Sequence, residues 1–397
     1  MLGASHSKDA ANRKSKIRPL SSSGRAATRH LPSSCGCLSV AGCFLLSACS
    51  TTVPNTTLAP TTEFGRQIDS LWDILLIAGI VVFVIVEVAL LYVLFRFRAR
   101  ENDPRPKQVH GNTVLEITWT LIPALVLVFI AVPTVRTIFS TQAPPGATAL
   151  QVEVIGHQWW WEFRYPQYGI TTANELYLPV GRTVNFALST ADVLHSFWIP
   201  QLGGKRDLIS NDTNYISFAA ESAYVWNGFC AEFCGASHAN MRFRAFTMPT
   251  AEFDRWVLHQ KSPPVIGGSV AFTVPALPRH TIPTTSLPSD VSVGATAGDA
   301  TRGAAVYKTS ACIGCHNIAG VSPGVIGPNL THIGSRTTIG AALYPNDFQH
   351  MARWIKNAPA LKPGSLMPPM GKGLERTMGN LDDQQIADIA AYLLSLK

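Results

Sequence analysis

Two long stretches of almost continuous apolar residues occupy the first third of the chain. They run over residues 71–95 and 115–139. At a rise of 1.5 Å per residue, a helix of either length exceeds the ~30 Å hydrocarbon core of a bilayer. Pro123 and Pro133 lie inside the second stretch, and membrane helices tolerate proline. The pattern predicts a transmembrane hairpin over residues 71–141, with buried core helices as the alternative.

The connector between the two apolar stretches is strongly basic, with cations at Arg96, Arg98, Arg100, Arg105 and Lys107. Short basic loops stay on the cytoplasmic side of a membrane. We therefore expect both outer ends of the hairpin, and the residues that come after it, on the extracytoplasmic side.

From about residue 148 the pattern changes to short segments rich in Val, Phe, Tyr and Trp, separated by Gly, Pro and Asn. Val184, Phe186 and Leu188 alternate with more polar neighbours, which is typical of a strand with one buried face. This pattern predicts an all-β Greek-key sandwich over residues 148–260.

The remainder divides into a polar segment and a helical one. Residues 261–295 are rich in Pro, Ser and Thr and lack periodicity, so we expect a flexible linker. After Asp382, a capping residue, the apolar positions Ile386, Ile389, Ala390 and Leu393 follow helical spacing. We therefore expect an all-α domain over residues 296–397.

The formal net charge of +7 arises almost entirely at the N-terminus. Residues 1–48 hold seven Lys and Arg against the single acid Asp9, and the rest of the chain is close to neutral. The chain therefore gives no support for nucleic-acid binding.

The basic N-terminus precedes an apolar run that is too short to span a bilayer, as in a secretory signal. The run ends in Leu46-Ser47-Ala48-Cys49, which resembles a bacterial lipoprotein cleavage box with Cys49 as the lipidated residue. We expect a signal peptide over residues 1–49 and a leader over 50–70. An ordinary signal peptide cleaved nearby is the alternative.

One twelve-residue loop concentrates metal-binding side chains at Cys230, Cys234, His238 and Met241. Soft sulfur with imidazole is a copper-type donor set, and a distant thioether is typical of copper electron-transfer sites. The two thiolates can bridge two copper ions, and His195 is a candidate for the second imidazole. A disulfide or a Cys₂His₂ zinc site is the alternative, but neither calls for Met241.

A second redox motif is Cys312-Ile-Gly-Cys315-His316, the C-x-x-C-H signature of covalent haem attachment. The thiols would bind the haem vinyl groups and His316 would be the proximal ligand. A thioredoxin-like dithiol is the alternative, and the adjacent histidine and the exported location count against it. A methionine is expected as the sixth ligand. The candidates are Met367, Met370 and Met378.

The loop string C-x-E-x-C-x-x-x-H-x-x-M and the segment Asp192-Val193-Leu194-His195-Ser196 resemble subunit II of the haem-copper cytochrome c oxidases. The resemblance covers about residues 71–259 and implies a cupredoxin-like domain with a binuclear CuA centre. It implies copper ligation by the side chains of His195, Cys230, Cys234, His238 and Met241 and by the backbone carbonyl of Glu232. It also implies a magnesium ion at the Glu232 side chain, where subunit I would be in contact.

The same resemblance implies roles for two further residues. Trp159, the first of three consecutive tryptophans, would receive electrons from a docked cytochrome, whereas Trp160 stands where the family usually has Tyr, which leaves its role open. Glu116 would lie at the cytoplasmic mouth of a proton path into subunit I. Alternatives are an aromatic belt or sandwich core for Trp159 and an ordinary interfacial carboxylate for Glu116.

Residues 296–397 resemble small class I cytochromes c. Gly327-Pro328-Asn329-Leu330 matches the segment that packs near the proximal histidine. The segment from Lys362 to Pro368 resembles that family's methionine-ligand loop, which makes Met367 the expected sixth ligand. His332 and His350 are expected to be ordinary polar residues.

These patterns predict a multidomain chain: a two-helix transmembrane hairpin, a cupredoxin-like Greek-key sandwich, and an all-α cytochrome c domain. The expected location is the bacterial inner membrane, with both redox domains outside the cytoplasm. By resemblance, the chain is a non-catalytic subunit II of a cytochrome c oxidase. It would take electrons from a cytochrome c donor through haem c and CuA and pass them to subunit I for oxygen reduction coupled to proton pumping. Subunit III is an expected further partner.

Three other classes of protein share parts of this pattern. A CuA-bearing nitric oxide reductase subunit stays open, because it would differ in its catalytic partner. A quinol oxidase subunit II would share the hairpin and sandwich but lack the copper ligands. A free-standing copper carrier would need neither two membrane spans nor a haem domain.

Overall fold

The computed structural model describes residues 55–100, 104–105, 107–142, 144–264, 272–279, 287–289, 291–295 and 297–397. The predicted signal peptide and its Cys49 lie outside the described residues.

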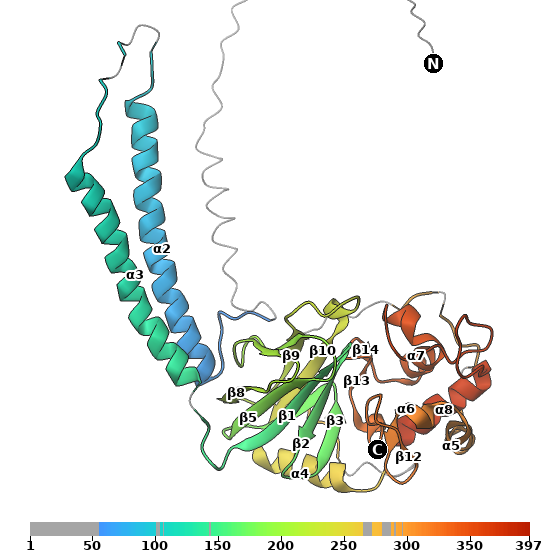
Figure 1. Ribbon diagram of the computed structural model, residues 1–397. Helices are drawn as coiled ribbons and strands as arrows, with labels where there is room; N and C mark the ends of the chain where they lie inside the picture. The colour runs from blue at the N-terminus through green and yellow to red at the C-terminus, as the bar shows by residue number, and fades with distance from the viewer. Residues whose placement is uncertain are drawn as a thin grey trace, which may run out of the picture. The chain divides into compact units, whose positions relative to one another are not determined.

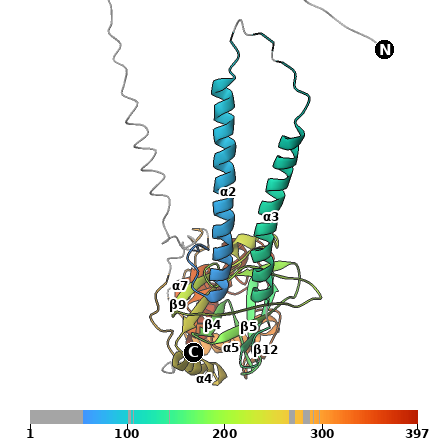
Figure 2. The same ribbon diagram turned by 90° about the vertical axis from the view of Figure 1, so that its left-hand side faces the viewer.

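Two long helices form the hairpin, α2 (Glu63–Arg96) and α3 (Thr113–Thr141) (Figures 1 and 2). Each begins at a polar cap: Thr62 accepts a hydrogen bond from the amide of Gly65, and Asn112 accepts one from the amide of Leu115. Both helices are long and apolar enough to cross a membrane, and as described neither contains a buried residue. So much apolar surface left uncovered by protein is what a lipid-facing hairpin presents.

The outer end of the hairpin is joined to the sandwich by side chains of the first helix. The Thr62 hydroxyl donates to the Leu202 carbonyl at 2.5 Å. Arg66 forms an ion pair with Glu221 at 2.7 Å. These contacts place the sandwich at the end of the hairpin opposite the basic connector.

The sandwich consists of two five-stranded sheets. The first contains β3 (Ile170–Ala173), β2 (Trp160–Tyr165), β1 (Leu150–His157), β5 (Thr183–Thr190) and β8 (Asn214–Ala219), in that order. The second contains β4 (Glu175–Pro179), β10 (Arg242–Met248), β9 (Tyr224–Cys230), β6 (His195–Trp198) and β7 (Arg206–Leu208), in that order. Val184, Phe186 and Leu188 are all buried, as the alternating pattern predicts.

Aromatic rings fill the space between the two sheets, and Phe243 lies at their centre. Its ring stacks on Phe197 at a centroid distance of 5.1 Å and meets Trp161 and Phe163 edge-on, each at 5.4 Å. Gly228 on the neighbouring strand makes room for this ring, because a Cβ there would lie 2.1 Å from Phe243 Cζ. The two strands that flank the metal-binding loop, β9 and β10, thus pack tightly against each other.

Part of the segment predicted as a flexible linker packs onto the sandwich. Helix α4 (Thr250–Lys261) precedes it and buries Trp256 against Tyr177. Phe272 is 5 % exposed and contacts Tyr177, and Arg279 pairs with Val225. The composition of this segment predicted a free chain. Burial of the Phe272 ring against Tyr177 instead holds this part of the segment on the sandwich.

The C-terminal domain is built on four helices: α5 (Ala300–Thr309), α6 (Cys312–Cys315), α7 (Phe348–Leu361) and α8 (Asp383–Ser395). Short pairs of strands and a 3₁₀ turn connect them: β11 (Asn317–Ile318), β12 (Ser322–Pro323), η2 (Ile333–Ser335), β13 (Thr338–Ile339) and β14 (Tyr344–Pro345). Asp382 caps α8 in a capping box with Gln385. Gly303 lets α5 cross α8 closely, since a Cβ would lie 1.9 Å from the Asp388 carbonyl oxygen. The predicted architecture of hairpin, β-sandwich and helical domain is confirmed.

Candidate metal centre and haem pocket

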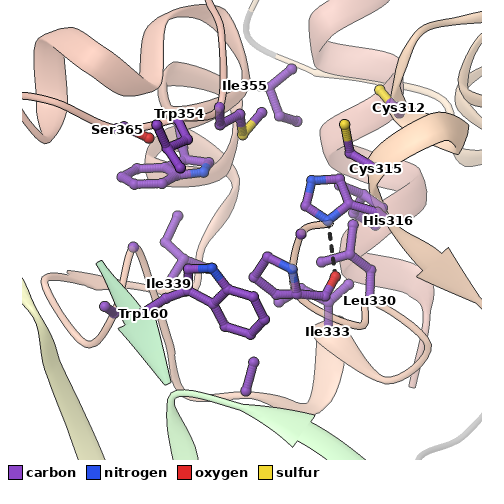
Figure 3. A pocket seen from close by; sticks show the side chains of 18 of the residues that line it. Trp160, Cys312, Cys315, His316, Leu330, Ile333, Ile339, Trp354, Ile355 and Ser365 are labelled. Carbon is purple, nitrogen blue, oxygen red and sulfur yellow. Dashed lines mark hydrogen bonds between the residues drawn. The ribbon is translucent and has the colours of Figure 1, made fainter. Parts of the chain in front are cut away.

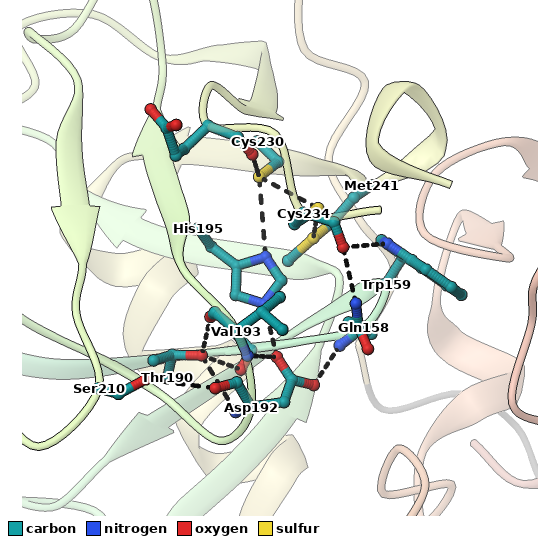
Figure 4. Close-up of polar contacts among 12 residues, drawn as sticks. Gln158, Trp159, Thr190, Asp192, Val193, His195, Ser210, Cys230, Cys234 and Met241 are labelled. Carbon is teal, nitrogen blue, oxygen red and sulfur yellow. Dashed lines mark hydrogen bonds and ion pairs between the residues drawn. The ribbon is translucent and has the colours of Figure 1, made fainter. Parts of the chain in front are cut away.

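The five side chains predicted to bind copper converge at one end of the sandwich. Figure 4 shows four of them: His195, Cys230, Cys234 and Met241. Cys230 ends β9, and its Sγ lies 3.8 Å from Nδ1 of His195, the first residue of the neighbouring β6. Cys234 Sγ lies 3.8 Å from Cys230 Sγ, 3.7 Å from His238 Nδ1 and 3.8 Å from Met241 Sδ. The loop between β9 and β10, with its 3₁₀ turn η1 (His238–Asn240), thus brings four of the donors to the fifth.

The donor set fits copper better than the alternatives. The two cysteines are free, and their sulfur separation is far beyond the ~2.05 Å of a disulfide bond. Ligand atoms of His195, Cys230 and Cys234 all lie within 4.8 Å of one another, and all three residues are buried. The Met241 thioether lies next to Cys234, and a thioether beside Cys and His ligands is typical of copper electron-transfer sites. The Glu232 carbonyl oxygen lies beside this cluster, 3.2 Å from Cys230 Sγ.

His195 is held in one orientation by Asp192. The Asp192 carboxylate contacts His195 Nε2 at 2.8 Å, which turns Nδ1 toward Cys230. Burial lowers the pKa of His195, but the hydrogen bond with Asp192 and the proximity of Cys230 outweigh it, so that the pKa is raised. The other oxygen of Asp192 accepts a hydrogen bond from the amide of Gln158 at 2.6 Å.

The two thiols are close enough to share one proton. Hydrogen bonding with Cys234 lowers the pKa of Cys230, and hydrogen bonding with Cys230 raises the pKa of Cys234. One thiolate is therefore favoured before any metal binds, which suits a site that needs deprotonated sulfur.

Two glycines shape this site and could not be recognised from their sequence alone. A Cβ on Gly156 would lie 2.7 Å from Cδ2 of His195, so the imidazole packs directly on the backbone of β1. Gly235 has a φ of +114°, which other residues rarely adopt, and it reverses the chain directly after Cys234.

The haem motif lies at the edge of an apolar pocket in the C-terminal domain (Figure 3). Cys312 and Cys315 occupy the two ends of α6, and His316 follows at its C-cap. His316 Nδ1 donates to the Pro328 carbonyl at 2.9 Å, which leaves Nε2 free to bind iron. A Cβ on Gly327 would lie 2.6 Å from the His316 ring, so the predicted segment 327–330 cradles the imidazole. The pocket lining fits a haem with a proximal histidine.

All three candidate methionines line the same pocket. Met370 is 3 % exposed, Met367 is half-buried and packs against the core of the domain, and Met378 is 63 % exposed. Exposure counts against Met378. His332 and His350 are not among the residues that line the pocket within the described chain.

The haem pocket also takes residues from the sandwich, among them Trp159 and Trp160. Figure 3 shows Trp160 in the pocket wall. Trp159 is 8 % exposed, and its Nε1 donates to the Cys234 carbonyl at 3.0 Å. On its other side, a Cβ on Gly364 would lie 2.8 Å from the Trp159 ring. Trp159 therefore lies between the copper-type loop and the methionine-ligand loop. Trp160 stacks on His157 at a centroid distance of 4.1 Å.

Glu116 lies in the first turn of α3, at the connector end of the hairpin.

Comparison with known proteins agrees with this architecture. Residues 59–137 match the family model "Cytochrome C oxidase subunit II, transmembrane domain", residues 169–245 match "Cytochrome C oxidase subunit II, periplasmic domain", and residues 300–397 match "Cytochrome c". The fold and the site define a two-pass membrane protein with a cupredoxin-like domain and a cytochrome c domain.

Relatives that match most of the chain identify its family. Cytochrome c oxidase subunit 2 of Alkalihalophilus pseudofirmus is 34 % identical over 342 residues, covering 84 % of this chain and 89 % of the relative. The protein of that name from Bacillus sp. strain PS3 is 34 % identical over 322 residues, covering 76 % and 80 %. The chain belongs to the cytochrome c oxidase subunit II family, whose members are components of an oxidoreductase complex.

Two further similarities cover less of the chain. Quinol oxidase subunit 2 of Bacillus subtilis is 34 % identical over 223 residues, covering 54 % of this chain and 68 % of the relative. The crystal structure of the periplasmic domain of subunit II of cytochrome oxidase from Bradyrhizobium japonicum is 28 % identical. It covers 30 % of this chain and 96 % of that structure, with a TM-score of 0.28.

We expect Asp192→Ala to weaken copper binding by about 10- to 100-fold, because His195 loses the partner that orients its ring. Copper titration of the purified chain, followed by optical absorption, measures the change. Asp254→Ala is the matched control, since Asp254 is exposed on α4. Equal affinities in the two variants would show that Asp192 does not orient the ligand.

Proposed function

We propose that this chain is the electron-accepting subunit of a cytochrome c oxidase. It takes electrons from a cytochrome c donor at its own haem domain and delivers them through a binuclear copper site to subunit I, where oxygen is reduced to water and protons are pumped. The observation that supports this most strongly is Trp159, whose indole contacts the copper-type loop on one side and the methionine-ligand loop on the other.

In this proposal two groups of residues hold the two cofactors. The copper ligands are the side chains of His195, Cys230, Cys234, His238 and Met241, with the carbonyl of Glu232. The haem is attached covalently to Cys312 and Cys315, with His316 and Met367 as axial ligands. When bound, the copper and haem supply the one-electron chemistry.

The chain's own residues keep these centres rigid and dry. His195 is fixed between Asp192 and the backbone of Gly156, and the Trp159 indole closes the loop over Cys234. His195, Cys230, Cys234 and Met241 are buried, which keeps water away from this side of the copper site. Because few groups can move when a charge arrives, little reorganisation accompanies electron transfer.

The intact copper ligand set favours a cytochrome c donor over a quinol. Some relatives are quinol oxidase subunits, and a quinol oxidase subunit does not need a cluster of two cysteines, two imidazoles and a thioether. Here all five side chains gather at one point.

We further propose the remaining assignments by resemblance. The hairpin crosses the bacterial inner membrane with both redox domains outside the cytoplasm, and Cys49 carries a lipid. Subunits I and III are partners within the membrane. The Glu232 side chain binds magnesium at the contact with subunit I, and Glu116 marks the start of a proton path.

The copper site should be binuclear. The purified chain should hold two copper ions and give a delocalised mixed-valence EPR signal, because two thiolates can bridge two ions. Cys230→Ser should abolish the centre, since a hydroxyl is a poor copper ligand. A single copper ion per chain with a mononuclear signal would contradict the assignment.

Met367 should be the sixth haem ligand. Met367→Ala should abolish the weak absorption band of the iron–sulfur bond in the oxidised protein, while Met370→Ala should retain it and lower the melting temperature, since Met370 is buried. Optical spectra of the two variants decide between the methionines, and the opposite pattern would assign the ligand to Met370.

Trp159 should control the rate at which electrons pass from the haem domain to the copper site. Trp159→Phe, which loses the hydrogen bond to Cys234, should slow the transfer, and Trp159→Ala should slow it further while the ligands of both centres remain. Flash-induced transfer within the intact chain gives the rates. Trp198→Phe is the control, because Trp198 does not line the pocket; equal rates in all four proteins would remove Trp159 from the path.

A further inference from the structure

Each of the two redox domains buries one charged side chain that forms hydrogen bonds with the other domain. The sandwich contributes Glu175, which is 0 % exposed, and the haem domain contributes Lys362, which is 4 % exposed. Neither residue is a predicted metal or haem ligand. A charge removed from water is costly unless it is paired or hydrogen-bonded.

Glu175 on β4 is satisfied mainly by the haem domain. Its Oε1 accepts hydrogen bonds from the amide and hydroxyl of Thr337 at 2.8 and 2.6 Å. It also accepts from the amide and hydroxyl of Thr338 at 3.0 and 3.1 Å. Burial lowers the pKa of the neighbouring Arg336, and the charge of Glu175 acts in the opposite direction to raise it.

Lys362 supplies the reciprocal contact. It begins the methionine-ligand loop, and its Nζ donates to the backbone carbonyl of Trp159 at 2.5 Å. Burial lowers the pKa of Lys362 to about 7, a measure of how far the amine is removed from water. Next to it, the Ser237 hydroxyl in the copper-type loop donates to the Pro363 carbonyl.

These contacts act on the residue that joins the two centres. Trp159 donates to Cys234 through its indole and accepts from Lys362 through its carbonyl. A shift of the haem domain would leave Glu175 with the Tyr177 hydroxyl and Lys362 with the more distant Gly340 carbonyl. A buried charge that loses most of its hydrogen bonds is strongly unfavourable. The hydrogen bonds of Glu175 and Lys362 therefore favour one position of the haem domain on the sandwich.

We propose that Glu175 and Lys362 are positioning residues that hold the haem domain docked on the copper domain, so that electron transfer occurs within a preformed contact and requires no search by a tethered domain. This inference rests on the proposed function for its purpose. The docking itself is independent of redox chemistry and can be tested separately.

The first test cuts the covalent connection in the full-length chain within the oxidase complex. A site for a specific protease, inserted after Thr284, allows cleavage after folding. We expect the haem-domain fragment to remain bound to the complex in gel filtration at micromolar concentration. Glu175→Gln and Lys362→Met should each weaken its binding at least tenfold. The matched controls are Glu252→Gln and Lys372→Met, which should leave the binding unchanged.

A variant on the opposite face guards against misfolding of the Glu175 variant. Thr337→Ala removes one hydroxyl donor to Glu175 and keeps the amide donor. It should weaken binding of the cleaved fragment by less than Glu175→Gln does. The two substitutions together should cost less than the sum of their separate effects, because they break the same contact. Strict additivity would overturn the assignment of Glu175 and Thr337 as partners.

The second test uses the uncleaved chain. The rate of haem-to-copper transfer should be independent of solvent viscosity in the wild type and should become slower and viscosity-dependent in Lys362→Met. If the wild-type fragment leaves the complex on cleavage, or if the transfer rate in the uncleaved wild type falls with viscosity, the docking proposal is overturned while the electron path stands. If the fragment stays bound but no electrons reach copper, the proposed function fails and the docking stands.

Discussion

The carbonyl oxygen of Cys234 is the point on which the whole arrangement depends. It accepts hydrogen bonds from Trp159 Nε1 at 3.0 Å and from Gln158 Nε2 at 2.7 Å, and the sulfur of the same residue lies at the centre of the copper-type cluster (Figure 4). One residue therefore couples the metal-binding loop to the surface that meets the haem domain. The loop cannot shift without disturbing this surface, and the indole cannot turn away without leaving the carbonyl unpaired.

The sandwich explains why such a coupling can be rigid. The loop is anchored by β9 and β10, whose close approach at Gly228 is filled by the ring of Phe243. His195 starts the adjacent strand β6 and packs on the backbone of Gly156 in the opposite sheet. Both sheets thus hold the ligand set. The same principle appears in the haem domain, where Gly327 and Pro328 fix the imidazole of His316 from two sides.

Sequence patterns were sufficient for features that depend on local chemistry. The two apolar stretches predicted α2 and α3, the Asp382 cap predicted the start of α8, and ligand spacing brought Cys230, Cys234, His238 and Met241 into one loop. The Asp192–His195 pair was also within reach, since a carboxylate three residues before a candidate ligand is a local signal. The roles of Glu175 and Lys362 could not be predicted, because their partners on the other domain lie more than 150 positions away in the chain and only the tertiary fold brings them together. The packing of Phe272 was missed for the same reason.

In the proposed electron path the haem domain is the donor to the copper site, and Trp159 lies between them. The most direct measurement is stopped-flow reduction of the intact chain by a cytochrome c donor, followed separately at the haem and copper absorption bands. We expect the haem to be reduced first and copper to follow as the haem is reoxidised. Reduction of copper before haem would contradict the proposed path.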